Sequence, residues 1–248
     1  MKKTIPLLLA LFALAPFSKA VIVSFDGGIA TTLDGQETEV TTTNQVSDVS
    51  SYQEQTITLT YNLYENAGIS SWQTVGDYYA TENSVIHGHW EGLNSIEIER
   101  VNNIPFDLQY FQITSNTSIG GGPSTGDENI AIQGFLNGVA VTQLFGLPSE
   151  DWGPETVKDV FLPNSFNNVD KVVISDRGTF AEHTGGSDCP TCNSAFCFGM
   201  DNFVFDEVVP ETLIQGNAET LSAVPEISAS LLCSLSLLLL LQRKKFHK

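Results

Sequence analysis

The segment from Thr56 to Tyr64 alternates strictly between polar and apolar residues. Its apolar positions are Ile57, Leu59, Tyr61 and Leu63, and its polar positions are Thr56, Thr58, Thr60 and Asn62. Successive side chains of a β-strand point to opposite sides, so a period of two is typical of a strand with one buried face. No window of the chain has a convincing 3.6-residue period, which argues against a helical fold.

Several further segments also have the pattern of strands. Ser95 to Arg100 repeats the alternation, and Asn137-Gly138 between the apolar runs 129–136 and 139–145 predicts a two-residue hairpin loop. Other strands are expected at Val21–Phe25, Val85–His89, Phe106–Thr114, Val157–Phe161, Lys171–Ser175 and Cys197–Phe205. About ten short strands, separated by Gly, Asn, Asp and Pro, predict an all-β fold, a single antiparallel β-sandwich of the jelly-roll kind.

The two ends of the chain have the composition of targeting segments. Residues 1–20 contain Lys2 and Lys3, an apolar stretch and the small residues Ser18 and Ala20, which predicts a secretory signal peptide. Near the other end, an apolar run from Ile227 to Leu241 is followed by a cationic cluster, Arg243-Lys244-Lys245. As a helix this run would span about 22 Å, less than the roughly 30 Å hydrocarbon core, so a marginal transmembrane helix with its cations on the cytoplasmic side is expected.

Val224-Pro225-Glu226, the apolar run and the Arg243-Lys244-Lys245 cluster resemble, in this order, the PEP-CTERM sorting signal of Gram-negative bacterial surface proteins. The resemblance implies export, a transient membrane anchor and processing by an exosortase-type enzyme, followed by release to the cell surface or the extracellular space. An unprocessed single-pass anchor is the alternative. The expected organisation is a signal peptide (1–20), a β-sandwich domain (21–209), a linker (210–223) and a sorting tail (224–248).

The predicted mature domain is strongly acidic. Of the basic residues only Arg100, Lys158, Lys171 and Arg177 lie outside the two targeting segments, against 28 of the 29 acids, which leaves a formal charge of −24. Such a charge repels nucleic acid and anionic lipid. A solvated acidic surface accounts for it, and so would cation binding.

A second resemblance concerns the central domain. The order of the Phe106-Asp107-Leu108 strand, the Gly134 to Val141 hairpin, the segment 166–174 and the Gly199 to Phe203 strand resembles the sandwich domains of PEP-CTERM proteins. Those domains are similar in outline to lectin-like carbohydrate-binding modules, so the resemblance implies binding of an extracellular polysaccharide and no catalytic residues. Exposed aromatic rings stack on sugars, and the ligand-binding candidates are Trp72, Tyr78, Trp90 and Trp152.

A catalytic alternative depends on Glu97 and Glu99. Two residues apart on one strand, they share a face at about 7 Å, and a pair of carboxylates is what glycoside hydrolysis requires. The strand also resembles the E-x-D-x-E strand of laminarinase-type hydrolases, with two of its three acids. The competing interpretation is a row of solvated acids beside Arg100. Gly122 to Gly126 fits the G-x-S-x-G pattern but lies in a glycine-rich stretch without the helix that this chemistry needs.

Two groups of residues are candidates for metal binding. Asp26 near the first strand and Asp201 with Asn202 in the last could converge on a structural calcium if the terminal strands pair. His87 and His89 share a face of one strand and could chelate a transition metal with a third ligand. In each case an exposed polar surface is the alternative.

Cys189, Cys192 and Cys197 form the densest cysteine cluster. With His183 they could bind zinc, but export to an oxidising compartment favours a disulfide. Cys192 with Cys197 and Cys189 with Cys197 are both open, whereas Cys233 lies in the apolar tail.

Three hypotheses for the function follow. The first is a non-enzymatic surface or matrix protein that binds extracellular polysaccharide, with an exosortase-type enzyme and the export machinery as its other partners. The second is a secreted glycoside hydrolase that uses Glu97 and Glu99. The third is a structural envelope component without a ligand.

Overall fold

The fold was analysed in a computed structural model, which describes residues 21–63, 74–77, 84–88, 93–117, 130–147, 157–176, 197–214, 219–220 and 222–223. The predicted signal peptide and sorting tail lie outside these ranges. The described residues form an all-β structure without an α-helix, which confirms the all-β part of the prediction. Among the described residues, short 3-10 helices occur at Val101–Asn103, Asn164–Phe166 and Glu211–Leu213. Within the same ranges, no helix is long and apolar enough to cross a membrane.

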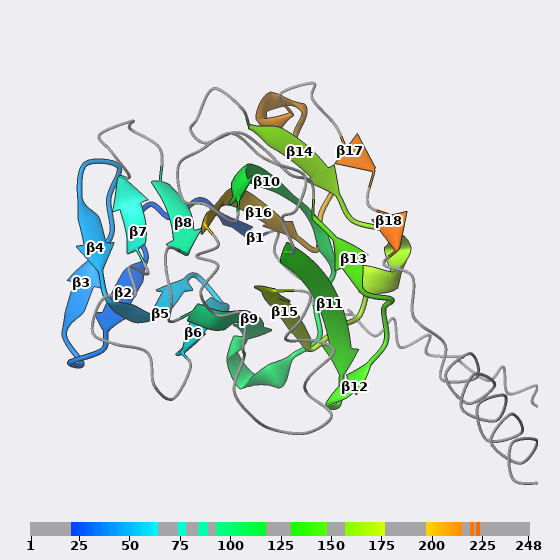
Figure 1. Ribbon diagram of the computed structural model, residues 1–248, viewed down its shortest axis with the longest axis horizontal. Helices are drawn as coiled ribbons and strands as arrows, with labels where there is room; N and C mark the ends of the chain where they lie inside the picture. Colours follow the sequence, from blue (N-terminus) through cyan, green and yellow to red (C-terminus); the bar gives the residue numbers. More distant parts are fainter. Residues whose placement is uncertain are drawn as a thin grey trace, which may run out of the picture.

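The strands belong to two sheets (Figure 1). The first sheet contains β1 (Val21–Val23), β4 (Gln45–Ser47), β7 (Thr74–Asp77), β8 (Ser84–Gly88), β10 (Leu108–Thr117), β14 (Lys158–Phe161), β16 (Cys197–Phe205) and β17 (Glu219–Thr220). These eight strands follow the order β17-β14-β10-β16-β8-β7-β4, and β1 also pairs with β16. All pairs in this sheet are antiparallel except β14 with β17.

The second sheet is larger and entirely antiparallel. It contains β2 (Ile29–Thr32), β3 (Glu37–Glu39), β5 (Val49–Glu54), β6 (Ile57–Leu63), β9 (Leu93–Arg100), β11 (Ile130–Leu136), β12 (Val139–Ala140), β13 (Phe145–Gly146), β15 (Lys171–Asp176) and β18 (Ser222–Ala223). Its ten strands follow the order β18-β13-β11-β15-β9-β6-β5-β2-β3, and β12 pairs with β11.

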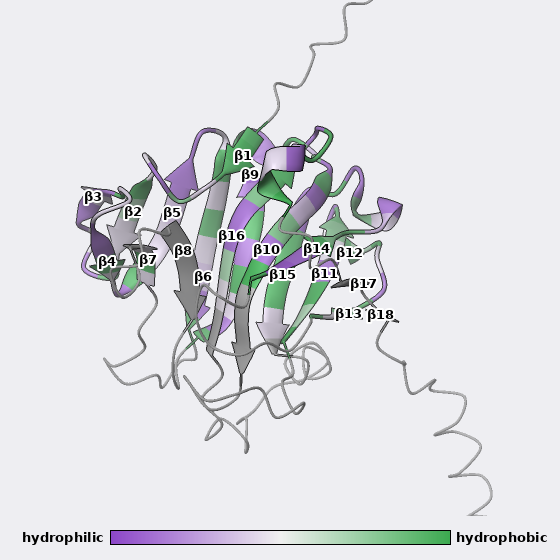
Figure 2. Cartoon of the chain, turned by 90° about the horizontal axis from the view of Figure 1, so that it is seen from above, coloured by the Kyte–Doolittle hydropathy of each residue, from purple (hydrophilic) through white to green (hydrophobic). Residues whose placement is uncertain are grey.

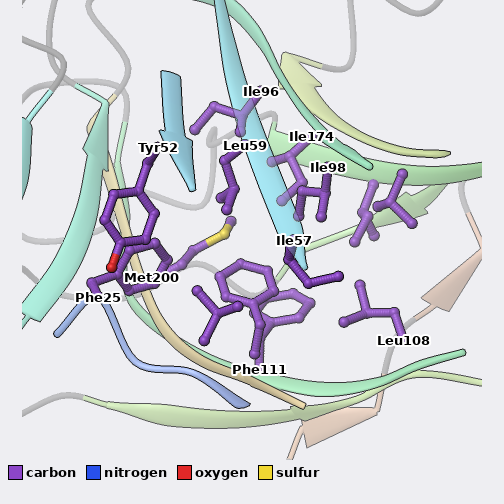
Figure 3. Packing of buried hydrophobic residues seen from close by; sticks show 14 of the residues in the cluster. Phe25, Tyr52, Ile57, Leu59, Ile96, Ile98, Leu108, Phe111, Ile174 and Met200 are labelled. Carbon is purple, nitrogen blue, oxygen red and sulfur yellow. The ribbon is translucent and has the colours of Figure 1, made fainter. Parts of the chain in front are cut away.

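One hydrophobic core lies between the two sheets (Figure 3). Leu59, Ile98 and Ile174 enter it from the ten-stranded sheet, whereas Phe111 and Met200 enter it from the eight-stranded sheet. Along strands such as β10 and β16, hydrophobic and hydrophilic bands alternate (Figure 2). The inward residues supply the apolar burial that stabilises the fold, and the outward residues of each sheet are left for other contacts.

The regular strands were predicted well. Ile57, Leu59 and Tyr61 are buried on β6 as expected, and β16 covers the predicted segment 197–205. The hairpin at Asn137-Gly138 is confirmed, because both residues have positive φ and join β11 to β12.

The second arm of that hairpin differs from the prediction of one strand over 139–145. It divides into β12 and β13, separated by residues 141–144. The division follows from Thr142, whose Oγ1 accepts a hydrogen bond from the Gly134 N–H at 2.9 Å and so takes the place of a backbone partner.

The chain after β16 remains attached to both sheets. We call the described residues between Asp206 and Ala223 the strap. The Leu213 carbonyl accepts hydrogen bonds from the Tyr110 hydroxyl at 3.2 Å and from Gln112 Nε2 at 2.7 Å. After this contact, β17 pairs with β14 and β18 pairs with β13. Residues expected to form a linker therefore contribute an edge strand to each sheet.

Candidate functional site

The outer face of the ten-stranded sheet carries Glu97 and Glu99, the two predicted candidates for catalysis. Glu97 and Glu99 alternate on β9 with the buried Ile96 and Ile98, so both carboxylates point away from the core. Cross-strand partners share a face of a sheet. The register therefore identifies which residues of the other strands lie beside these two glutamates.

Two rows of side chains cross this outer face. The first row, from β3 to β11, is Glu39, Ile29, Gln53, Thr58, Glu99, Lys171 and Phe135. The second row, over the same strands, is Glu37, Thr31, Ser51, Thr60, Glu97, Val173 and Gln133. Most of these side chains are polar and at least partly exposed, which gives the sheet a continuous hydrogen-bonding surface.

Lys171 links the two rows. It is the cross-strand partner of Glu99, but its Nζ bonds to the Oε2 of Glu97 at 3.2 Å. The same Nζ lies 6.0 Å from the centre of the Phe135 ring, which favours the ammonium through a cation–π contact. The side chains of Lys171 and Glu97 are 29% and 30% exposed, so water screens their attraction. The contact fixes the position of the Glu97 carboxylate and partly neutralises it.

Arg100 does not belong to the row of glutamates. It is buried at the end of β9, where its guanidinium pairs with Asp206. The interpretation of Glu97 and Glu99 as solvated acids beside Arg100 is therefore revised, since their neighbouring cation is Lys171 from β15.

The calcium candidates lie where the terminal strands meet. β1 pairs with β16 through Val23 and Phe203, so β16, which carries Asp201 and Asn202, lies beside β1, which ends three residues before Asp26. Asp26 is exposed, whereas Asp201 accepts hydrogen bonds from the backbone N–H of Asn202 at 2.7 Å and from its Nδ2 at 3.1 Å. Burial raises the pKa of Asp201 well above its usual range. The described residues contain no group of three or more His, Cys, Asp and Glu able to hold a metal.

Most of the other predicted site residues lie outside the described ranges. These are Trp72, Tyr78, His89, Trp90, Trp152, Cys189 and Cys192, together with the sorting-signal residues Val224, Pro225, Glu226, Arg243, Lys244 and Lys245. His87 and Cys197 are described only as backbone, in β8 and β16.

Several described strand ends lie together at one end of both sheets. Leu63 pairs with Leu93 and Ile130 with Asp176 in one sheet, and Gly88 pairs with Phe198 in the other. Arg100 and Asp206, which form an ion pair, lie at the other ends of β9 and β16. The strand ends in the three pairs above therefore all lie at the end of the two sheets that is remote from Arg100. Trp72, Trp90 and Trp152 each occur between strands that end or begin there.

Sequence reasoning missed a buried carboxyl group at Glu54. Its Oε2 accepts hydrogen bonds from the Tyr52 hydroxyl at 2.7 Å and from the Phe25 N–H at 2.9 Å, and its Oε1 accepts one from the Ser24 N–H at 3.2 Å. Burial raises the pKa of Glu54 above its ordinary value, although these hydrogen bonds favour the ionised form. The sequence contains little signal for it, because only Tyr52 is apolar among the alternate positions Ser50, Tyr52 and Glu54 of β5.

A second missed group lies on the outer side of the eight-stranded sheet. Tyr110 and Gln112 alternate with the core residues Phe111 and Ile113, yet both are buried, because the strap covers them. The Tyr110 hydroxyl donates to Asp159 Oδ1 at 2.6 Å, and Gln112 Oε1 accepts from Asn202 Nδ2 at 2.8 Å. These two contacts connect β10 to β14 and β16, and the bonds of Tyr110 and Gln112 to the Leu213 carbonyl hold the strap on the sheet, so the role of the group is structural.

Comparisons with models of protein families, with curated proteins and with solved structures each found no match.

Proposed function

We propose that this chain is an exported bacterial surface or matrix protein whose body, a jelly-roll-like β-sandwich, binds extracellular polysaccharide without cleaving it. The observation that supports this most is the outer face of the ten-stranded sheet, where two rows of polar side chains cross seven neighbouring strands. Hydroxyl, amide and carboxylate groups at strand spacing can bond to successive sugar hydroxyls, and Phe135 adds an aromatic surface.

The targeting part of the proposal depends on the two ends of the sequence. The signal-peptide-like start and the PEP-CTERM-like tail, with Val224-Pro225-Glu226 and Arg243-Lys244-Lys245, favour export, transient anchoring and processing by an exosortase-type enzyme. Intact-mass analysis of the exported protein tests this. Loss of everything beyond the Val224-Pro225-Glu226 region is expected, and full-length protein in the inner membrane would count against processing.

Binding is favoured over hydrolysis because of the environment of Glu97. A hydrolase needs one carboxyl group as a proton donor and a second as a base or nucleophile. Glu97 instead bonds to the Lys171 ammonium, so one of its oxygens already has a partner on the protein, as in an ion pair that shapes a binding surface. A hydrolase using Glu97 and Glu99 remains the alternative.

Binding and hydrolysis can be distinguished by testing the purified domain, Val21 to Ala223, against a panel of polysaccharides. Retention on a polysaccharide without release of reducing ends is the expected result. Release of reducing ends that disappears in Glu97→Gln would establish the hydrolase instead. If neither retention nor release occurs with any polysaccharide, a structural envelope component without a ligand is the remaining function.

A further inference from the structure

We infer that the polysaccharide bound by the outer face is a polymer with free ammonium groups, of the amino-sugar class, and that it lies across the strands along the two rows. This inference rests on the proposed function and names the chemistry of its ligand. Three observations carry it: the charges of the rows, the spacing of their acids and the fixed position of Lys171.

The charges of the two rows are unbalanced. The rows contain four carboxylates, from Glu37, Glu39, Glu97 and Glu99, and one ammonium, from Lys171. The single cation bonds to Glu97, and within the described part of the chain no side chain pairs with the carboxylates of Glu37, Glu39 or Glu99. An anionic polymer would be repelled by this face, whereas a cationic one would be attracted.

The acids are spaced along the direction that a polymer would follow. Glu39 and Glu99 belong to the same row and lie four strands apart, on β3 and β9, a separation of about 19 Å at the usual strand spacing. Ile29, Gln53 and Thr58 lie between them, and the last two supply hydrogen-bonding groups. One extended chain could therefore contact both carboxylates, and the polar groups between them would bond to its hydroxyls.

Repetition along the polymer compensates for the weakness of each contact. An exposed ion pair contributes little by itself, because water and salt screen it. A second contact made by the same polymer is effectively intramolecular, so several weak pairs combine into useful avidity. A polymer with regularly repeated ammonium groups suits an open face with separated carboxylates better than a small cation does.

Lys171 makes Glu99 the central contact of the first row. Because its Nζ bonds to Glu97 and lies over the Phe135 ring, Lys171 is directed away from the Glu99 carboxylate that its backbone faces. Glu99 is therefore the acid at the middle of the sheet that remains to pair with a ligand ammonium.

The experiment uses the full chain, purified in a mild detergent, and measures its affinity for three soluble polymers. These are short, water-soluble oligomers of β-1,4-linked glucosamine, of its N-acetylated counterpart and of a uronic acid, all of the same length. The first is expected to bind most tightly, and its binding should weaken as salt is added. Glu99→Gln and Glu39→Gln should each lower this affinity about fivefold, which corresponds to an exposed ion pair at the upper end of its usual range.

Glu211→Gln is the matched control, because it removes the same charge from an exposed 3-10 turn of the strap, away from the two rows. Its affinity should equal that of the unmodified protein, and thermal unfolding should confirm that all variants fold. An equal loss in Glu211→Gln and Glu99→Gln would mean that net charge alone attracts the polymer, and would overturn the inference. Tighter binding of the acetylated polymer would overturn the ligand class and leave the proposed function standing. Absence of binding to every polysaccharide would overturn both.

Discussion

Arg100 of the ten-stranded sheet forms a buried ion pair with Asp206, the residue that follows β16 of the eight-stranded sheet. The other carboxylate oxygen of Asp206 accepts a hydrogen bond from the Asp107 N–H at 2.8 Å. The Arg100 guanidinium also lies 5.7 Å from the centre of the Phe106 ring. One charged contact thus connects the two sheets and the start of the strap.

Arg100→Met should destabilise the protein by about 3 to 5 kcal/mol, because it removes the guanidinium that pairs with the buried Asp206 carboxylate. The double variant Arg100→Met/Asp206→Asn should recover part of this loss, since asparagine is neutral and keeps an acceptor for Asp107. Urea unfolding measures both. Lys171→Met, which removes an exposed pair, is the comparison and should cost less than about 1 kcal/mol. A similar cost for Lys171→Met and Arg100→Met would contradict the structural role given to Arg100.

The buried Glu54 should make stability depend on pH. Its pKa in the folded protein is raised by burial above the ordinary 4.5, so the folded state holds this proton more tightly than the unfolded chain does. The resulting stabilisation is fully present below pH 4.5 and is lost as the pH rises through the folded-state pKa. Within that window the contribution falls by at most about 1.4 kcal/mol per pH unit.

Urea midpoints measured from pH 4 to pH 8 test this contribution. In Glu54→Gln the part of the pH dependence that arises from Glu54 should disappear, because an amide does not titrate. Glu211→Gln removes an exposed carboxyl instead and should keep the profile of the unmodified protein. A profile unchanged by Glu54→Gln would show that this carboxyl has the same pKa in the folded and unfolded states.

Gly134 should not tolerate a side chain. A Cβ built there lies 2.8 Å from the Thr142 Cγ2 and 3.0 Å from the Val169 Cγ1, so Gly134→Ala should cost about 1 to 3 kcal/mol through overpacking. Thr142→Ser removes the closer methyl group and keeps the Oγ that accepts from the Gly134 N–H. The double variant Gly134→Ala/Thr142→Ser should therefore recover part of the stability lost in Gly134→Ala, as measured by thermal unfolding. If Thr142→Ser brings no recovery, the crowding arises elsewhere.

The sequence predicted the fold best where one face of a strand is apolar. The alternation at Ile57, Leu59 and Tyr61 located β6, and Asn137-Gly138 located the hairpin. It did not predict β3, because Glu37, Thr38 and Glu39 are all exposed and have no apolar phase.

The candidate site was predictable only in part. The period of β9 placed Glu97 and Glu99 on one face, but their neighbours come from strands distant in the sequence. The pairing of Lys171 with Glu97, 74 residues apart, depends on the register between β9 and β15, which no local pattern encodes. The same holds for Glu39, which joins the row of Glu99 only through the order of four intervening pairings.

The cysteine cluster should contain one disulfide after export. Cys189, Cys192 and Cys197 are close in sequence, and an oxidising compartment favours a bond between two of them. Thiol labelling of the denatured protein, with and without reductant, should show a gain of two thiols on reduction. Variants in which each of the three cysteines is replaced in turn by Ser distinguish the pairings. If reduction yields no additional thiol, the disulfide is absent and zinc binding by the cluster becomes the favoured interpretation.

The strap should be required for a stable body, and its removal tests whether residues after β16 act as a linker. Truncation after Ala223 removes only the sorting tail and should leave the unfolding temperature unchanged. Truncation after Glu207 also removes the Leu213 carbonyl that accepts from Tyr110 and Gln112, and it removes β17 and β18 from the edges of the two sheets. Buried polar groups would then lose a partner and strand edges would be exposed, so this variant should unfold earlier and aggregate. Thermal unfolding with light scattering measures both effects. Equal behaviour of the two truncations would mean that residues 208–223 contribute nothing to the body.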